Sequence, residues 1–266
     1  MKIDFHTHCF PDAMAEKVLK ALSHAAGCID YFTDGTKNGI KKALDKAGLD
    51  KAVVLNIATN PEKHKKINDA ALALNDDSII GFGSIHPAAP DCMDELERIA
   101  EMGLKGIKLH PEYQNFQTDD PKMFPIYEKI GSLGLITVFH AGYDDAYMPP
   151  PKCTPQSLSN ALPYFGGATV VAAHMGSYMM WKEVYETLCG RDIYFDTSFC
   201  FSRIPKPLMA AIIKKHGTDR ILFGSDSPWG DMEKEIRLID SLELPQKDYD
   251  MIMGGNAERL LFLNNY

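Results

Sequence analysis

Short apolar segments alternate with helix-like segments along the whole 266-residue chain. The alternation predicts eight strands, at residues 3–8, 51–57, 79–85, 105–110, 135–140, 168–173, 192–197 and 220–223. Strands that are apolar almost without interruption are typical of a parallel sheet covered by helices. Eight strand–helix repeats therefore predict an α/β fold, a single (β/α)8 TIM barrel. The alternative is a doubly wound open sheet, but the first strand lacks the glycine-rich phosphate turn typical of one.

The segments between these strands predict helices at residues 12–22, 39–47, 61–74, 92–102, 121–132, 154–164, 178–188, 205–216, 231–242, 246–253 and 256–263. Asp12 and Thr154 stand where helix caps are expected, and Gly48 where a helix should end. Residues 23–38 predict a small irregular insertion after the first strand and its helix, which is a candidate lid. Because no linker or change of composition interrupts the pattern, we expect one domain over residues 1–266.

Charge and cysteine usage restrict the class of protein. The formal net charge is −8, from 28 basic and 36 acidic residues, and no basic block argues for nucleic acid or an anionic membrane as partner. No run of about 18 apolar residues predicts a membrane span. The chain enters a strand at once without a leader-like segment, and its six cysteines are scattered. We therefore expect free thiols and a cytoplasmic protein.

Two histidines stand two residues apart at the end of the first strand. Side chains alternate along a strand, so His6 and His8 should point the same way, and Asp4 shares their parity. Two imidazoles on one side are half of a divalent metal site. A lone pair of this kind is more often simply exposed, but ionisable residues recur at the ends of later strands.

These ionisable residues form a set: His6, His8, Lys108, His110, His140, His174, Asp196 and Asp226. In a (β/α)8 barrel the carboxyl ends of the strands meet at the mouth that holds the active site. Buried ionisable groups are costly unless they are paired or bind a ligand. A cluster of imidazoles and carboxylates suits zinc, iron or manganese. Within the set, Asp196 is expected to be structural.

Local motifs around these residues are also informative: Asp4-Phe5-His6-Thr7-His8, Gly106-Ile107-Lys108-Leu109-His110-Pro111, Phe139-His140-Ala141-Gly142, Ala173-His174-Met175-Gly176 and Phe223-Gly224-Ser225-Asp226-Ser227-Pro228. Their order resembles the amidohydrolase superfamily, in the amidohydrolase-related branch that includes aminocarboxymuconate semialdehyde decarboxylase-like enzymes. The resemblance spans the chain and ends in the helix at 255–260. It is specific for fold and metal, and it does not define a substrate.

The resemblance implies one divalent ion, zinc first and manganese or iron as alternatives, with these ligands: His6, His8, His140 and Asp226. It implies that His174 orients or deprotonates the metal-bound water, or polarises the substrate. Asp226 would also carry a proton from the nucleophile to the leaving group. The ion would lower the pKa of water from about 15.7 to about 7.

Lys108 has three interpretations. Some superfamily members carry a carboxylated lysine on strand 4, which would bridge to a second metal held by His140 and His174. Alternatively, Lys108 binds a substrate carboxylate, or it pairs structurally with Glu112 or Asp196. We rank the single-metal site first, because the amidohydrolase-related branch that the chain resembles consists mostly of mononuclear enzymes. His110 shares the parity of Lys108 and is expected to support the ligands or to bind substrate.

The sequence thus predicts a metal-dependent hydrolase acting on a small organic acid, lactone or amide. The first alternative is a non-oxidative decarboxylase with the same metal site and a cationic clamp, for which the candidates are Lys108, Arg203 and Lys37. Residues 23–38 contain no arginine, which favours hydrolysis. The second alternative, a non-catalytic metal-binding barrel, does not explain His174 and Asp226, because a structural site needs no general base.

Substrate specificity should reside in the loops after the strands, at residues 9–38, 111–120, 141–153 and 198–204. A small molecule is the expected partner. A homodimer is one option for the assembly.

Overall fold

Eight parallel strands form the centre of the structure, a computed structural model that describes residues 1–200 and 203–263. The strands are β1 (Ile3–Thr7), β2 (Lys51–Leu55), β3 (Ile79–Phe82), β4 (Gly106–Leu109), β5 (Ile136–Phe139), β6 (Val170–Ala172), β7 (Tyr194–Asp196) and β8 (Ile221–Leu222). Regular pairing gives the orders β1-β2-β3 and β4-β5-β6-β7-β8. Residues 201–202 of the predicted 198–204 loop, and residues 264–266, lie outside the described part.

Backbone contacts at both junctions close these two sheets into a cylinder. Between β3 and β4, Gly83 forms a bridge with Ile107, and the Lys108 amide donates to the Gly83 carbonyl at 2.9 Å. Between β8 and β1, the Phe5 amide donates to Phe223 at 2.8 Å, and the bridge continues from Thr7 to Ser227. The predicted (β/α)8 TIM barrel is therefore confirmed.

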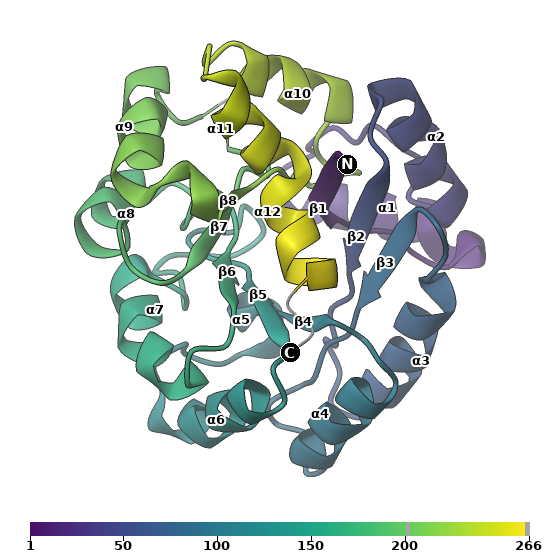
Figure 1. The fold of residues 1–266 in the computed structure, drawn as a ribbon. Helices are drawn as coiled ribbons and strands as arrows, with labels where there is room; N and C mark the ends of the chain where they lie inside the picture. The colour runs from purple at the N-terminus through teal and green to yellow at the C-terminus, as the bar shows by residue number, and fades with distance from the viewer. Residues whose placement is uncertain (201–202, 264–266) are drawn as a thin grey trace.

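Helices surround the cylinder, as the ring of coiled ribbons in Figure 1 shows. They are α1 (Asp12–Ala25), α2 (Lys37–Ala47), α3 (His64–Leu74), α4 (Cys92–Glu101), α5 (Pro111–Gln114), α6 (Phe124–Ser132), α7 (Pro155–Ala161), α8 (Trp181–Thr187), α9 (Lys206–His216), α10 (Met232–Asp240), α11 (Gln246–Asp250) and α12 (Asn256–Glu258). Among the described residues, no helix is long and apolar enough to cross a bilayer. None of the six cysteines forms a disulfide.

The C-terminal helices close the amino-terminal end of the barrel. An apolar cluster joins side chains from strands on all sides, such as Phe5 and Val138, to Leu260 and Leu261 of the closing segment. In Figure 1 this segment crosses the end of the barrel. A Cβ on Gly254 would meet the Met1 carbonyl at 1.9 Å, so a glycine is needed where the segment crosses the chain's start. With this end filled by apolar side chains, polar groups concentrate at the opposite mouth.

Local signals are confirmed at some boundaries and are wrong at others. Thr154 caps α7 in a capping box with Ser157, and Gly48 ends α2 at φ 67°. Asp12 does not cap α1, because Pro11 occupies the cap position and Asp12 lies in the first turn. The loop predicted at residues 111–120 instead begins with the short helix α5.

Candidate metal centre

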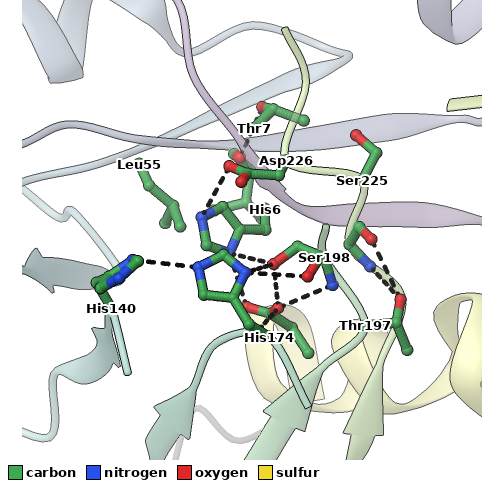
Figure 2. Close-up of polar contacts among 12 residues, drawn as sticks. His6, Thr7, Leu55, His140, His174, Thr197, Ser198, Ser225 and Asp226 are labelled. Carbon is green, nitrogen blue, oxygen red and sulfur yellow. Dashed lines mark hydrogen bonds and ion pairs between the residues drawn. The ribbon is translucent and has the colours of Figure 1, made fainter. Parts of the chain in front are cut away.

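Imidazole and carboxylate side chains converge at the carboxyl end of the barrel (Figure 2). His6, His174 and Asp226 each offer a ligand atom, and these atoms all lie within 4.8 Å of one another. The Nε2 atoms of His6 and His8 lie 3.4 and 3.2 Å from the same Asp226 oxygen. Residues from opposite ends of the chain thus meet because β1 and β8 are neighbours in the barrel.

Hydrogen bonds fix the orientation of both β1 imidazoles. The Nδ1 atom of His6 lies 2.8 Å from the Asp196 carboxylate, and that of His8 lies 2.8 Å from the Leu55 carbonyl. Both partners can only accept, so each Nδ1 carries a hydrogen, and in the neutral imidazole each Nε2 keeps its lone pair. A histidine that donates one N–H to a carboxylate or carbonyl and directs its other nitrogen inward is the usual metal-ligating arrangement.

Asp196 organises the base of this site. One of its oxygens accepts from the backbone amides of His174 and Ser198, at 3.1 Å each, and from the Ser198 hydroxyl. Its other oxygen accepts from His6. Burial favours the neutral acid, but the adjacent His6 and its hydrogen bond outweigh burial and hold the pKa of Asp196 well below its usual range. Asp196 thus supports His6 and the His174 backbone, and its structural rather than catalytic role stays a prediction.

At His6 and Asp226, burial and neighbouring groups favour the protonation states that a metal requires. Burial lowers the pKa of His6 from 6.5 to about 4, so the imidazole is neutral at neutral pH. Burial opposes ionisation of Asp226, but the nearby His6 and His8 lower its pKa from 3.8 to about 2. Neutral imidazole and ionised carboxylate are the ligand forms that bind a divalent ion.

His140 and His174 also present lone pairs to each other. Nδ1 of His174 lies 2.9 Å from the Ser198 carbonyl, and Nε2 of His140 lies 3.0 Å from the Tyr143 carbonyl. Both nitrogens therefore carry hydrogen, and the remaining nitrogens face each other at 3.1 Å with lone pairs. Two lone pairs at this distance repel unless a proton or a cation lies between them. The donor set of this mouth therefore fits a metal cation.

The predicted catalytic residues have unusual backbone. His174 and Asp226 both adopt left-handed conformations, with φ of 61° and 64°. Such a conformation costs roughly 1 kcal/mol for a residue with a side chain. It is held by the Asp196 carboxylate, which accepts the His174 amide, and by the His6 carbonyl, which accepts the Asp226 amide at 2.8 Å. The barrel thus holds both side chains at the mouth at the expense of local strain.

A second group of candidate ligands adjoins the first. His110, His140 and Asp144 also bring their ligand atoms within 4.8 Å of one another. The His110 ring stacks between Tyr113 and His140, with centroid distances of 4.1 and 4.2 Å, and its Nε2 lies 3.3 Å from Asp144. His140 is thus one contact removed from the first group, through His174, and the predicted four-ligand set stays a prediction. Sequence reasoning missed Asp144, because it lies in a loop without a strand-end signal.

Lys108 is buried within this mouth, with 1% of its surface exposed. Its Nζ finds no hydrogen-bond partner in residues 1–200 and 203–263, so the predicted alternative of a structural pair with Glu112 or Asp196 is wrong. Burial lowers the pKa of Lys108 from 10.5 to about 8, against the opposing charges of Asp196 and Asp226. The side chain therefore remains mainly cationic at neutral pH.

The other clamp candidates lie differently. Arg203 is near the mouth, 3.5 Å from the Asp145 carboxylate, with its guanidinium over the Tyr178 ring. Lys37 pairs with Asp76 at 2.7 Å. Both cations thus already have an anionic partner. Asp4, expected on the same face as His6 by parity, instead accepts the backbone amides of His6 and Ser225, because the register of β1 shifts between Asp4 and Thr7.

These features define a (β/α)8 barrel with a candidate histidine–aspartate metal centre at its carboxyl-terminal mouth. The chain matches the family model described as amidohydrolase over residues 3–263, and it belongs to this family.

Solved structures of similar fold carry several activities in their names. An uncharacterized TIM-barrel protein of Bordetella bronchiseptica shares 18% identity at TM-score 0.78, over 98% of both chains. The 5-carboxyvanillate decarboxylase of Sphingomonas paucimobilis shares 17% identity at TM-score 0.71, also over 98% of both chains. A putative 2-pyrone-4,6-dicarboxylic acid hydrolase of Pseudomonas putida shares 16% at TM-score 0.69, over 100% of this chain and 98% of that one. At these identities the likeness is one of fold.

Proposed function

We propose that this chain is a metal-dependent hydrolase that cleaves a C–O or C–N bond in a small organic acid, lactone or amide. The observation that carries the proposal is the convergence of the His6 and His8 Nε2 atoms on one oxygen of the Asp226 carboxylate. The ion would be held by the four predicted ligands: His6, His8, His140 and Asp226. When bound, it lowers the pKa of water to about 7 and polarises a substrate carbonyl.

The protein groups around this centre have distinct roles. The Nε2 lone pair of His174 is free to accept a proton or to hold the attacking water, because its Nδ1 donates to the Ser198 carbonyl. Asp226 is 7% exposed and can pass a proton to the leaving group at the mouth. Asp196 keeps His6 in the tautomer that directs Nε2 inward. The burial of these side chains limits competing water.

Zinc, manganese and iron all suit imidazole and carboxylate ligands. Manganese has some support from a similar structure, a dihydroxybenzoic acid decarboxylase of a Polaromonas species with bound manganese, at 16% identity and TM-score 0.69 over 100% of this chain and 98% of that one. We expect metal analysis of the purified protein to find about one equivalent of one of these ions. A native protein that binds none of the three would contradict the proposal.

Replacing Asp196 with asparagine should weaken metal affinity by about 10- to 100-fold, as for other residues that support a ligand histidine. An amide cannot be the anionic acceptor that His6 has in the native site. Competition with a metal-sensitive dye measures the change. Asp192→Asn, at an exposed position close to β7, is the matched control and should leave affinity unchanged. Equal metal affinity in both variants would show that Asp196 does not support the metal ligands.

Non-oxidative decarboxylation is the second candidate, favoured by the unpaired cation of Lys108 at the mouth. The Lys108 cation would serve as the clamp in place of the arginine that residues 23–38 lack. The similar structure from Sphingomonas is named as a decarboxylase. Metal-loaded protein should be tested with lactones and amides and, in parallel, with aromatic and β-keto carboxylates for CO₂ release. We expect hydrolysis of the first set. CO₂ release without hydrolysis would assign the lyase instead.

We also propose a cytoplasmic protein, supported by six cysteines without a disulfide. A small molecule is the proposed partner, and the mass in solution would test the homodimer.

A further inference from the structure

Lys108 is a buried cation for which the described structure provides no partner. Its backbone is fixed, because its amide donates to Gly83 at 2.9 Å and its carbonyl accepts from the Ser84 hydroxyl at 2.8 Å. The side chain is 1% exposed, yet Nζ makes no hydrogen bond to any residue in the described ranges. Removing an ammonium group from water without a partner is costly. Apolar residues occupy interior positions on neighbouring strands, so the lysine requires an explanation of its own.

Lys108 lies on β4 two residues before His110, and it pairs with Val138 of β5, the strand that leads into His140. Its charge contributes to lowering the pKa values of His6 in the first group and of His110 and His140 in the second. The carboxylates of Asp144 and Asp226 act on it in turn. Nζ makes no hydrogen bond to either carboxylate in the described residues. The ammonium therefore keeps its donors for a ligand that enters at the mouth.

The chemistry of the site selects the kind of ligand. An ammonium is a compact charge with three donors, which suits an anionic oxygen. The neighbouring carboxylates disfavour a ligand of high negative charge, such as a phosphate dianion, since like charges repel. Arg203 is less suited, because it is partly exposed and already within 3.5 Å of Asp145. A monovalent carboxylate matches the one charge of Lys108, whose Nζ has no hydrogen-bond partner in the described residues.

We propose that Lys108 anchors a carboxylate group of the substrate at the inner end of the mouth, between His6 and His140. This deepens the proposed function and rests on it, because it defines the substrate class as small carboxylic acids bound through that group. The anchor serves either reaction. In hydrolysis it holds the acid group while another bond is cleaved, and in decarboxylation it holds the group that leaves.

The test compares matched anionic and neutral probes, benzoate with benzamide and butyrate with butyramide, by titration calorimetry. Metal-free protein is used first, so that chelation of the carboxylate by an ion does not contribute. Wild type should prefer each carboxylate over its amide by about tenfold or more, the expected effect of a hydrogen bond to a charged group. Lys108→Met should lose this preference, and Lys108→Arg should retain part of it. Arg203→Met, which removes the competing cation, should keep it in full.

Several outcomes would overturn the proposal. They are a wild type without preference for carboxylates, a Lys108→Met variant that keeps the preference, and a preference lost only in Arg203→Met. A labile carboxylate on Lys108 together with two equivalents of metal would also overturn it, in favour of a bridging role. Lys108→Met should fold, because methionine fills a similar volume without charge, and thermal unfolding checks this. Metal content is measured separately, so loss of the metal proposal and loss of the anchor are distinguishable.

Discussion

Asp226→Asn is expected to lower kcat/KM by about a thousandfold or more. Its oxygen lies within 3.4 Å of the Nε2 atoms of both β1 histidines, so the neutral amide removes the negative charge around which the site is arranged. The amide also cannot accept a proton, and general acid–base catalysis alone is worth about 10²- to 10⁴-fold. The measurement is kcat and KM on the substrate identified by screening, with metal content determined on the same samples.

Asparagine is the informative replacement, because the backbone of Asp226 is left-handed at φ 64°. Asparagine tolerates this region better than most residues, so the variant separates the carboxylate from backbone strain. Asp45→Asn, at an exposed position of α2, is the control and should behave as wild type. Activity of Asp226→Asn within a few-fold of wild type, at full metal content, would exclude Asp226 as a catalytic group.

The barrel could be predicted because the patterns that indicate its strands and helices are local in the sequence. Each strand is a short apolar run, and each helix repeats apolar residues on one face, so order and type of the elements follow from the chain alone. The ends of the strands and helices were less predictable. β3 ends at Phe82 although the predicted strand continued through residues 83–85, because Gly83 forms its bridge with Ile107 of β4 instead. Pairing partners of this kind are not visible in the sequence.

A change of register within β1 accounts for the parity error at Asp4. Alternation places Asp4, His6 and His8 on one face only if the strand is regular. The register of β1 against β2 shifts between Asp4 and Thr7, and Asp4 holds backbone amides instead of facing the imidazoles. A bulge depends on tertiary pairing and leaves no reliable signal in a strand of five residues.

The candidate site was predictable where a side chain belongs to a strand end, and not where it belongs to a loop. His6, His174 and Asp226 follow strands, and the barrel brings them together. Asp144 and Ser198 reach the site from loops. Asp144 contacts His110, and the Ser198 hydroxyl donates a hydrogen bond to Asp196. The position of a loop side chain depends on the folded loop, so polarity alone did not distinguish Asp144 from the neighbouring Asp145.

The role of His174 can be separated from that of a ligand by replacing it with asparagine. Its Nδ1 is engaged by the Ser198 carbonyl and its Nε2 faces His140, so the imidazole is placed to accept a proton beside the ion. Loss of a general base should reduce kcat by about 10²- to 10⁴-fold, with a smaller change in KM. Asparagine accommodates the left-handed backbone at φ 61°, and His24→Asn at an exposed position is the control.

Metal content of the same variant decides between two arrangements of the centre. If His174→Asn keeps its ion while turnover falls, His174 acts on water or substrate, and the predicted ligands His6, His8, His140 and Asp226 stand. If the ion is lost, His174 is itself a ligand, as its grouping with His6 and Asp226 within 4.8 Å allows. In that case His140 belongs with His110 and Asp144, and the four-ligand prediction is wrong at that position. Full activity with full metal content would remove His174 from the mechanism altogether.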